Sequence, residues 1–467
     1  MTNLSNTCRI SKEGVFIYSG GDHLTAEDVI SFIGQNEKDN TAHYMRNFDY
    51  YTGKHSILSD LRKTGGRPDN RIVVNAPHYL VDTYNGYFIG KSPKLALNDD
   101  EGNTISDDKP FQNWLNTTNF IDKLAELSKD VDIYGKSFIF CYQNEDSKTK
   151  IAVTDPTDSF VIYDDEITPH LLAYVRYFID NDGVQNADVY YADRQDHLES
   201  GKLTTVKDTN VYGAVPAVEF YESGERQGVF DIVISLIDEL DHALSQKANQ
   251  VEYFDNAYMK ILGLHLDNDS LQKLATNHLL YAPDAEAAKA NVGFIEKPDG
   301  DNMQENLLNR VSDLIYQISH IPNLRDKDFS GNASGVALEY KMLSMQNKAA
   351  NKEHQFKHAL RALFKVLFSI DTIVHNSDDW QNLKMTFYRN APQDLETDAS
   401  IAKDLTGIVS QKTLFKILPF VDNPDNEIKQ MQKEQGERVQ NMMTNSDNLY
   451  DYQKKPENND DLSNSTK

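Results

Sequence analysis

The residues that come nearest to a phosphate-binding motif lie at 85–93, in the stretch NGYFIGKSP. Gly90 and the two residues after it match the end of a Walker A loop, whose backbone amides and lysine bind phosphates. The first glycine of that motif should stand where the chain has Asn85, and Gly86 is one place late. Pro93 also blocks the helix that must follow such a loop. We interpret the stretch as a turn with a surface lysine and expect no nucleotide binding.

Three groups of side chains have residue types that bind metal ions. His354 and His358 are four residues apart on a predicted helix, which places both on one face, but no third ligand is evident. Paired carboxylates could hold Mg²⁺ for a nuclease, and two clusters qualify: Asp238, Glu239 and Asp241, and Asp164, Asp165 and Glu166. Such clusters are common in a chain with 72 acidic residues. No serine or cysteine nucleophile has a recognisable context, so we expect no catalytic residue, no cofactor and no metal.

The formal charge of −25 argues against a protein that grips nucleic acid, because that affinity comes from a cationic surface. The charge is compatible with a conduit through which DNA slides, since an acidic wall prevents DNA from adhering. It is equally compatible with acidity that only maintains solubility. The two cysteines, Cys8 and Cys141, make a disulfide framework implausible. Without a signal peptide or an apolar run near the roughly 18 residues of a membrane span, we expect a soluble protein made in a cytoplasm.

The hydrophobic period changes along the chain, and this change predicts an α+β fold. Apolar residues at helical spacing predict helices within 71–90 and 111–133, with a loop or weak hairpin at 91–110. Alternation with a period of two then predicts strands at 137–142, 150–155, 159–164 and 171–180. Asn181-Asp182-Gly183 is a hairpin turn signal, so these strands begin an antiparallel meander.

Two long amphipathic helices are predicted in the third quarter of the chain. The first covers 226–258, where ~30 residues would form a rod of about 45 Å. The second covers 303–322 and ends at Ile321-Pro322, because proline removes a donor and restricts its predecessor. A small α/β insert separates them at 259–302. The residues predicted to pack these helices are Leu236, Leu240, Leu244, Leu307, Val311, Leu314 and Ile318.

The last third of the chain begins with a glycine-bearing segment. Residues 323–337 contain small and charged side chains and are predicted to be a flexible loop feeding a long helix at 338–375. A lone strand at 383–390 returns to the first part of the fold, and 396–440 is again helical. Residues 441–467 are polar and expected to be disordered.

Several stretches, in their order and spacing, resemble the portal proteins of long-tailed phages that infect Gram-positive bacteria. They include YYTGKHSIL (50–58), IVVNAPHYLVDTYNGYFIGKSP (72–93), DIYGKSFIF (132–140), GAVPAVEF (213–220), FSGNASGVALEYKMLSMQNKAANKE (329–353) and VSQKTLFKILPFVDNPDNEI (409–428). Each stretch alone is weak, but together they span roughly residues 40–440. The resemblance implies a non-enzymatic subunit of a ring, usually of twelve copies, through which double-stranded DNA enters and leaves a capsid.

The resemblance also implies a use for each segment. Residues 1–225 with the strand at 383–390 would form the wing, 226–258 and 303–322 the stem, and 259–302 the clip. The segment 323–337 would be the tunnel loop, 338–375 the long wing helix, 396–440 the crown, and 441–467 a disordered tail. The implied channel residues are Arg325, Lys327, Ser330, Gly331, Asn332, Ser334 and Gly335. The two basic residues could attract DNA weakly or pair with Asp326 and Asp328.

The implied partners are copies of the chain, the passing DNA, a terminase motor, head-completion or adaptor proteins, and capsid and scaffolding proteins, without a membrane. The implied location is the portal vertex of the virion, after assembly in the bacterial cytoplasm. Two alternatives remain open. A head–tail adaptor or other structural virion ring fits the acidity but not the paired long helices, and a metal-dependent nuclease or nucleotide hydrolase needs a site that the sequence lacks.

Overall fold

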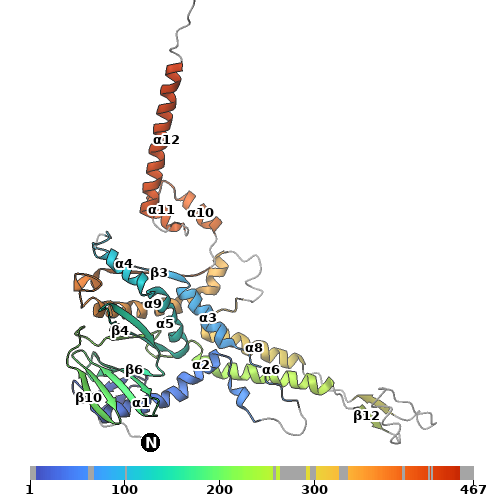
Figure 1. Cartoon of the computed structure of the whole chain (residues 1–467). Helices are drawn as coiled ribbons and strands as arrows, with labels where there is room; N and C mark the ends of the chain where they lie inside the picture. The colour runs from blue at the N-terminus through green and yellow to red at the C-terminus, as the bar shows by residue number, and fades with distance from the viewer. Residues whose placement is uncertain are drawn as a thin grey trace, which may run out of the picture. The chain divides into compact units, whose positions relative to one another are not determined.

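The structure is a computed structural model that describes residues 7–61, 68–99, 102–255, 259–262, 291–294, 301–324, 335–391, 395–418, 421 and 424–452. The chain divides into two compact units, residues 1–390 and 391–467. Figure 1 draws both units with the chain coloured from blue to red. The first unit combines helices with several sheets, so the predicted α+β class is confirmed.

A seven-stranded sheet forms the N-terminal part of the first unit, in the order β1-β2-β6-β7-β8-β9-β10. Only the β2–β6 pair is parallel among these neighbours. The strands are β1 (Cys8–Ile10), β2 (Phe16–Tyr18), β6 (Ser159–Asp164), β7 (Leu171–Ile179), β8 (Gln185–Tyr190), β9 (Gln195–Glu199) and β10 (Lys202–Lys207). Gly183 takes a left-handed φ of 78° in the β7–β8 turn, as the turn signal predicted.

Helix α1 (Ala26–Asp39) packs against this sheet. Val29, Phe32 and Ile33 are fully buried in one core with the sheet residues Phe16 and Phe160. The helix begins where Thr25 and Asp28 cap each other, because the Thr25 backbone N–H donates to Asp28 and the Asp28 N–H donates to the Thr25 hydroxyl. After α1 the chain continues through a π-helical turn (Asn40–Tyr44), α2 (Met45–Tyr51) and a short 3₁₀ turn, η2 (Ser56–Ser59).

A three-stranded sheet of order β11-β4-β5 forms the second part of the unit. Its strands are β4 (Lys136–Gln143), β5 (Thr149–Thr154) and β11 (Ala217–Tyr221). It lies against α5 (Phe120–Tyr134) and the long helix α9 (Gly335–Leu367), and α5 contacts α3 (Ala76–Ile89). Phe111, Trp114, Phe120, Phe364 and Phe368 form an aromatic cluster with neighbouring ring centroids 5.3–6.2 Å apart.

The loop or weak hairpin predicted at 91–110 is wrong at both ends of that stretch. Residues Lys91–Leu97 form β3, and α4 (Asp108–Thr117) begins within the same stretch. The strand pairs antiparallel with β14 (Leu383–Tyr388), which follows a 3₁₀ turn (Ser377–Asn382), so the predicted returning strand is confirmed. Polar residues alternate with the buried Pro93, Leu95 and Leu97 in β3, and this alternation was hidden by the acidic residues that follow.

The helix predicted at 111–133 is two helices. A break separates α4 from α5 at Asn119, whose φ of 50° is left-handed and cannot continue a helix. The long helix predicted at 338–375 begins earlier, at Gly335, and ends at Leu367. In the third quarter the chain forms a 3₁₀ turn, η3 (Asp231–Val233), then α6 (Ile234–Asp255), β12 (Met259–Leu262), β13 (Asn291–Phe294) and α8 (Asp301–Ser319).

The second unit is helical in its described part. It contains α10 (Leu395–Asp404), α11 (Gln411–Ile417) and α12 (Pro424–Tyr452). The Ser410 hydroxyl caps α11 by accepting the Thr413 N–H at 3.3 Å, and Pro424 is the first residue of α12. Because α12 continues to Tyr452, the start of the predicted disordered tail is instead helical. Residues 453–467 lie outside the described part of the chain.

Candidate functional site

The helices α6 and α8 form an antiparallel pair, visible side by side in Figure 1. Helix α6 buries Ile237 and Leu240, and α8 buries Val311 and Ile315. At the other end of the pair, Lys247 of α6 forms an ion pair with Glu305 of α8. The Gln304 amide there donates to Gln250 at 2.8 Å. Apolar contacts near the start of α6 and polar contacts near its end therefore hold the two helices together.

The residues predicted to pack these helices fall into three groups. Leu240 and Val311 are buried, whereas Leu236, Leu244 and Leu314 are half-buried. Leu307 and Ile318 are 44% and 38% exposed, so they keep a larger part of their surface in contact with water than the other five residues. The intrachain face of α8 runs through Val311 and Ile315 instead.

Helix α8 has a second apolar face beside the buried one. Met303, Leu307, Leu314 and Ile318 are spaced by four, seven and four residues, which places them in one stripe along the helix. Met303 is 73% exposed and Leu314 is half-buried. We call these four residues the outer stripe of α8. A single copy of the chain leaves the outer stripe partly in contact with water.

Little of the predicted clip and tunnel loop lies within the described residues. In the clip, β12 and β13 pair antiparallel with Met259 opposite Phe294. Arg325, Lys327, Ser330, Gly331, Asn332 and Ser334 lie outside the described residues. Gly335 is the first residue of α9. The proposed roles of these residues therefore continue to rest on the sequence.

The acidic cluster of α6 is divided among different partners. Asp238 accepts hydrogen bonds from the Tyr50 and Ser56 hydroxyls at 2.7 and 2.9 Å. Asp241 is fully buried and lies 2.5 Å from the His55 imidazole, whereas Glu239 is exposed. The carboxylates of Asp238 and Asp241 bind different protein groups, and the three residues do not form a group of possible metal ligands among the described residues.

A second acidic cluster lies in the exposed turn after β6. Ligand atoms of Asp164, Glu166 and His170 lie within 4.8 Å of one another, while Asp165 forms an ion pair with Arg9. His170 Nδ1 is 3.4 Å from Asp164 and 3.5 Å from Glu166, so an imidazole already lies between the carboxylates. The group lies on the surface and encloses no space for a substrate.

The remaining sequence candidates also lack a site geometry. His354 and His358 are both exposed on α9, and neither belongs to a group of three possible metal ligands among the described residues. Gly90 ends α3, and Lys91 begins β3. A phosphate-binding loop must precede a helix, whereas here the glycine follows one, so the turn interpretation agrees with the fold.

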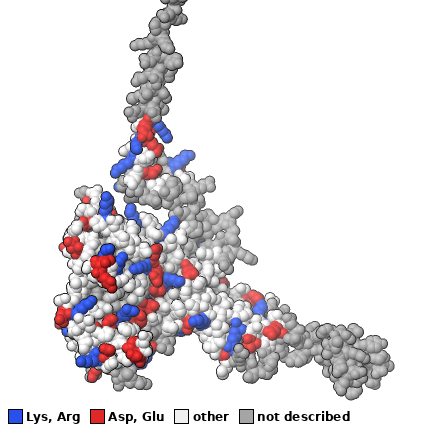
Figure 2. Space-filling view, in the orientation of Figure 1, with Lys and Arg blue, Asp and Glu red and all other residues white. Residues whose placement is uncertain are grey.

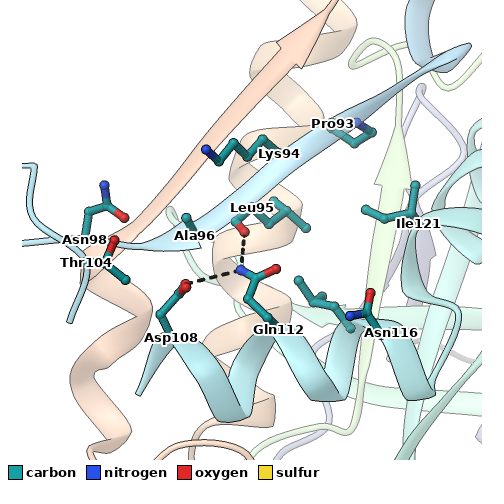
Figure 3. A pocket seen from close by; sticks show the side chains of 11 residues that line it. Pro93, Lys94, Leu95, Ala96, Asn98, Thr104, Asp108, Gln112, Asn116 and Ile121 are labelled. Atoms are coloured by element: carbon teal, nitrogen blue, oxygen red, sulfur yellow. Dashed lines mark hydrogen bonds between the residues drawn. The ribbon is translucent and has the colours of Figure 1, made fainter. Parts of the chain in front are cut away.

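A cavity of about 380 Å³ lies between β3 and α4. Figure 3 shows Gln112 at its centre, donating to the Leu95 carbonyl at 2.7 Å and to Asp108 at 3.2 Å. Asp108 also accepts the Leu97 N–H at 2.9 Å. These polar groups hold the strand against the helix, and the cavity brings together no acid–base pair.

Buried charges connect α9 to the rest of the first unit. Lys352 Nζ donates to Asp132 of α5 at 2.6 Å and to the Ser128 carbonyl at 3.2 Å, and both charged side chains are fully buried. Burial raises the pKa of Asp132 to about 7, and the Lys352 ammonium opposes that rise. One helical turn earlier, Lys348 lies 3.5 Å from Glu222. The position of α9 thus depends on charge pairs that water does not screen.

Asp130 on α5 supplies a pH-dependent prediction. Burial, together with the nearby Asp155 and Glu126 carboxylates, raises its pKa from 3.8 to about 7, and Lys129 lowers it only partly. The folded protein therefore holds this proton to higher pH than the unfolded chain, and stability is lost as pH rises through about 7. Asp130→Asn should thus stabilise the protein more at pH 8 than at pH 5, by about 1–2 kcal/mol after allowance for partial exposure.

Thermal unfolding of Asp130→Asn at the two pH values measures this difference. Asp146→Asn is the matched control because the Asp146 side chain is 72% exposed. Its effect on the thermal unfolding midpoint should be the same at pH 5 and pH 8. An equal gain for Asp130→Asn at pH 5 and pH 8 would contradict the raised pKa.

The charged surface is mixed. Figure 2 shows basic and acidic side chains interspersed over the described part of the visible face. None of the helices among the described residues is both long and apolar enough to span a bilayer.

Comparison with known proteins shows which family the sequence matches. The family described as "Phage portal protein, SPP1 Gp6-like" matches residues 30–441. The portal protein of Bacillus phage SPP1 is 22% identical over 416 residues, covering 82% of this chain and 79% of that protein. The portal protein of Clostridium phage phiCD119 is 22% identical over 408 residues, covering 80% of this chain and 88% of that protein.

Proposed function

Since the chain belongs to the SPP1 Gp6-like family of phage portal proteins, we propose that its copies form a ring around a DNA channel. DNA would be packaged into the capsid and later ejected through this channel. The outer face of the ring would bind the terminase motor during packaging and head-completion proteins afterwards. The chain itself would perform no catalysis, because ATP hydrolysis belongs to the motor.

The outer stripe of α8 is the observation that carries this proposal. Met303, Leu307 and Ile318 expose apolar surface on a helix whose other face is already packed against its own chain. A neighbouring copy that covers the stripe with a different surface makes a head-to-tail contact, and a repeated head-to-tail contact closes into a ring. Antiparallel helix pairs placed side by side in this way would form the wall of a channel.

The described elements suggest a use for each part of the subunit. We assign α6 and α8 to the stem, β12 and β13 to the clip, the two large sheets with α9 to the wing, and α10–α12 to the crown. The segment 323–337 remains the proposed tunnel loop because of its glycines and small side chains. With twelve copies the formal charge would be about −300, which follows from −25 per chain and favours a wall to which DNA does not adhere.

A packaging assay tests this function. Proheads assembled with and without the chain are supplied with terminase, ATP and linear double-stranded DNA, and nuclease-protected DNA is measured. We expect protection only in proheads that contain the chain. Equal protection without it would overturn the proposal. DNA cleavage by the purified chain with Mg²⁺ would favour the nuclease alternative.

A substitution in the proposed tunnel loop gives a second prediction. Gly331→Val should leave ring assembly intact and reduce packaged DNA about tenfold or more, because a β-branched residue removes backbone freedom where DNA passes. Gly224→Val is the matched control, since Gly224 lies in the wing with open space around the position of a Cβ. Unchanged packaging in Gly331→Val proheads would remove the tunnel assignment.

A further inference from the structure

The middle of α6 and the segment that follows α8 are both held by one continuous stretch of the wing. This stretch consists of the extended residues 69–75 and the first turn of α3, as far as Tyr79. We call it the strap. Its contacts with the two stem helices differ in kind.

The strap is bound to α6 through its backbone. Asp241, Ser245 and Asn249 lie one helical turn apart and accept the N–H groups of Val74, Ile72 and Asn70 at 2.7, 2.8 and 2.6 Å. Four residues of helix rise about 6 Å, and two residues of extended chain rise about 6.7 Å, so the two spacings nearly match. Three side chains of α6 thus pair with alternate amides of the strap, as a neighbouring strand would.

His55 orients the carboxylate of Asp241, the first of these acceptors. Its Nδ1 is 2.5 Å from Asp241 Oδ2, and its Nε2 is 3.1 Å from the Tyr50 carbonyl. The Tyr50 ring stacks on the imidazole with centroids 4.6 Å apart. Both ring nitrogens lie against oxygen atoms, and the second oxygen of Asp241, Oδ1, accepts the Val74 N–H.

Tyr79 holds the end of α8. Its hydroxyl accepts the Leu324 N–H at 2.8 Å and donates to the Pro322 carbonyl at 3.3 Å. Its ring packs edge-on against Tyr316, with centroids 5.7 Å apart. One hydroxyl group therefore binds the backbone on both sides of residue 323, where the chain leaves the stem.

We propose that the strap is the positioning element of the stem, and that the Tyr79 hydroxyl sets the path of residues 322–324 as the chain leaves α8. The strap binds side chains of α6 and backbone groups just after α8, and its end belongs to α3, which is buried in the wing along most of its length. A shift of the strap would move the middle of α6 and the exit from α8 together. The coupling of α6 to residues 322–324 through the strap rests on the contacts alone. Its importance for DNA passage rests on the proposed function.

Tyr79→Phe tests the inference because it removes only the hydroxyl and keeps the ring against Tyr316. We expect hydrogen exchange in the peptide that contains 322–324 to rise roughly fivefold to thirtyfold, the range that one or two lost hydrogen bonds allow. Ring assembly should be unchanged, and packaged DNA should fall several-fold. Ser245→Ala should raise exchange in the peptide 69–75 in the same way.

Two controls accompany these variants. Tyr142→Phe removes an exposed tyrosine hydroxyl from β4, and Ser235→Ala removes an exposed serine hydroxyl from α6 itself. Neither should change exchange or packaging. Unchanged exchange at 322–324 in Tyr79→Phe, or raised exchange with full packaging, would overturn the positioning role. Packaging by proheads that lack the chain would instead overturn the proposed function and leave the exchange result standing.

Discussion

Replacing Leu307 and Ile318 together with aspartate should leave each chain folded and abolish ring formation. Both side chains are partly exposed in the single chain, so aspartate carboxylates at these positions can reach water before assembly. In the ring, each aspartate would lie unpaired in an apolar contact, which costs several kcal/mol per interface. Light scattering after size-exclusion chromatography should give the mass of one chain, 53.1 kDa, with an unchanged thermal unfolding midpoint.

Ile315→Asp separates assembly from folding on the same helix. Ile315 is 1% exposed and faces its own chain, so this aspartate should cost about 4 kcal/mol or more and yield little folded protein. If the Leu307 and Ile318 variant still assembled, the outer stripe would not be the contact between copies.

Lys352→Met should lower the free energy of unfolding by about 3–5 kcal/mol. The substitution leaves Asp132 fully buried without its cation, and Asp132 Oδ2 already has no hydrogen-bond partner among the described residues. Urea unfolding of the purified protein, followed by circular dichroism, measures the loss. Lys384→Met is the control, because Lys384 is exposed on β14 and its loss should change little.

The double variant Lys352→Met with Asp132→Leu identifies the cause of that loss. Both charges are then absent, and apolar side chains fill the space beside Phe88 and Phe356, whose rings lie 4.8 and 5.4 Å from Lys352 Nζ. We expect most of the stability to return, because an apolar pair of similar volume often replaces a buried ion pair without loss. A double variant as unstable as the single one would show that the lysine acts through its packing.

Local periodicity predicted the elements whose residues form their own contacts. The strands at 137–142, 159–164 and 171–180 appear as β4, β6 and β7, and the two long helices appear as α6 and α8. Proline correctly marked where α8 must stop, although the helix ends slightly earlier, at Ser319. These features depend on side-chain alternation and backbone restrictions that a short window of sequence contains.

Features that depend on distant residues were missed. Strand β3 is defined by its pairing with β14, almost three hundred positions later in the chain, and its lysines resemble those of a loop. Apolar spacing on α8 could not show which of two adjacent stripes faces α6, so Leu307 and Ile318 were assigned to the buried one. The short polar residues Asp241, Ser245 and Asn249, spaced by four on α6, could have indicated a face that binds backbone amides. Asp241 was instead interpreted as part of an acidic cluster.

The mass and shape of the purified assembly test the central claim most directly. Twelve copies of 53.1 kDa give about 637 kDa, and negative-stain images should then show closed rings with a central hole. A chain that remains at 53.1 kDa at every concentration, and that never appears as a closed ring in infected cells, would contradict the claim that its copies surround passing DNA.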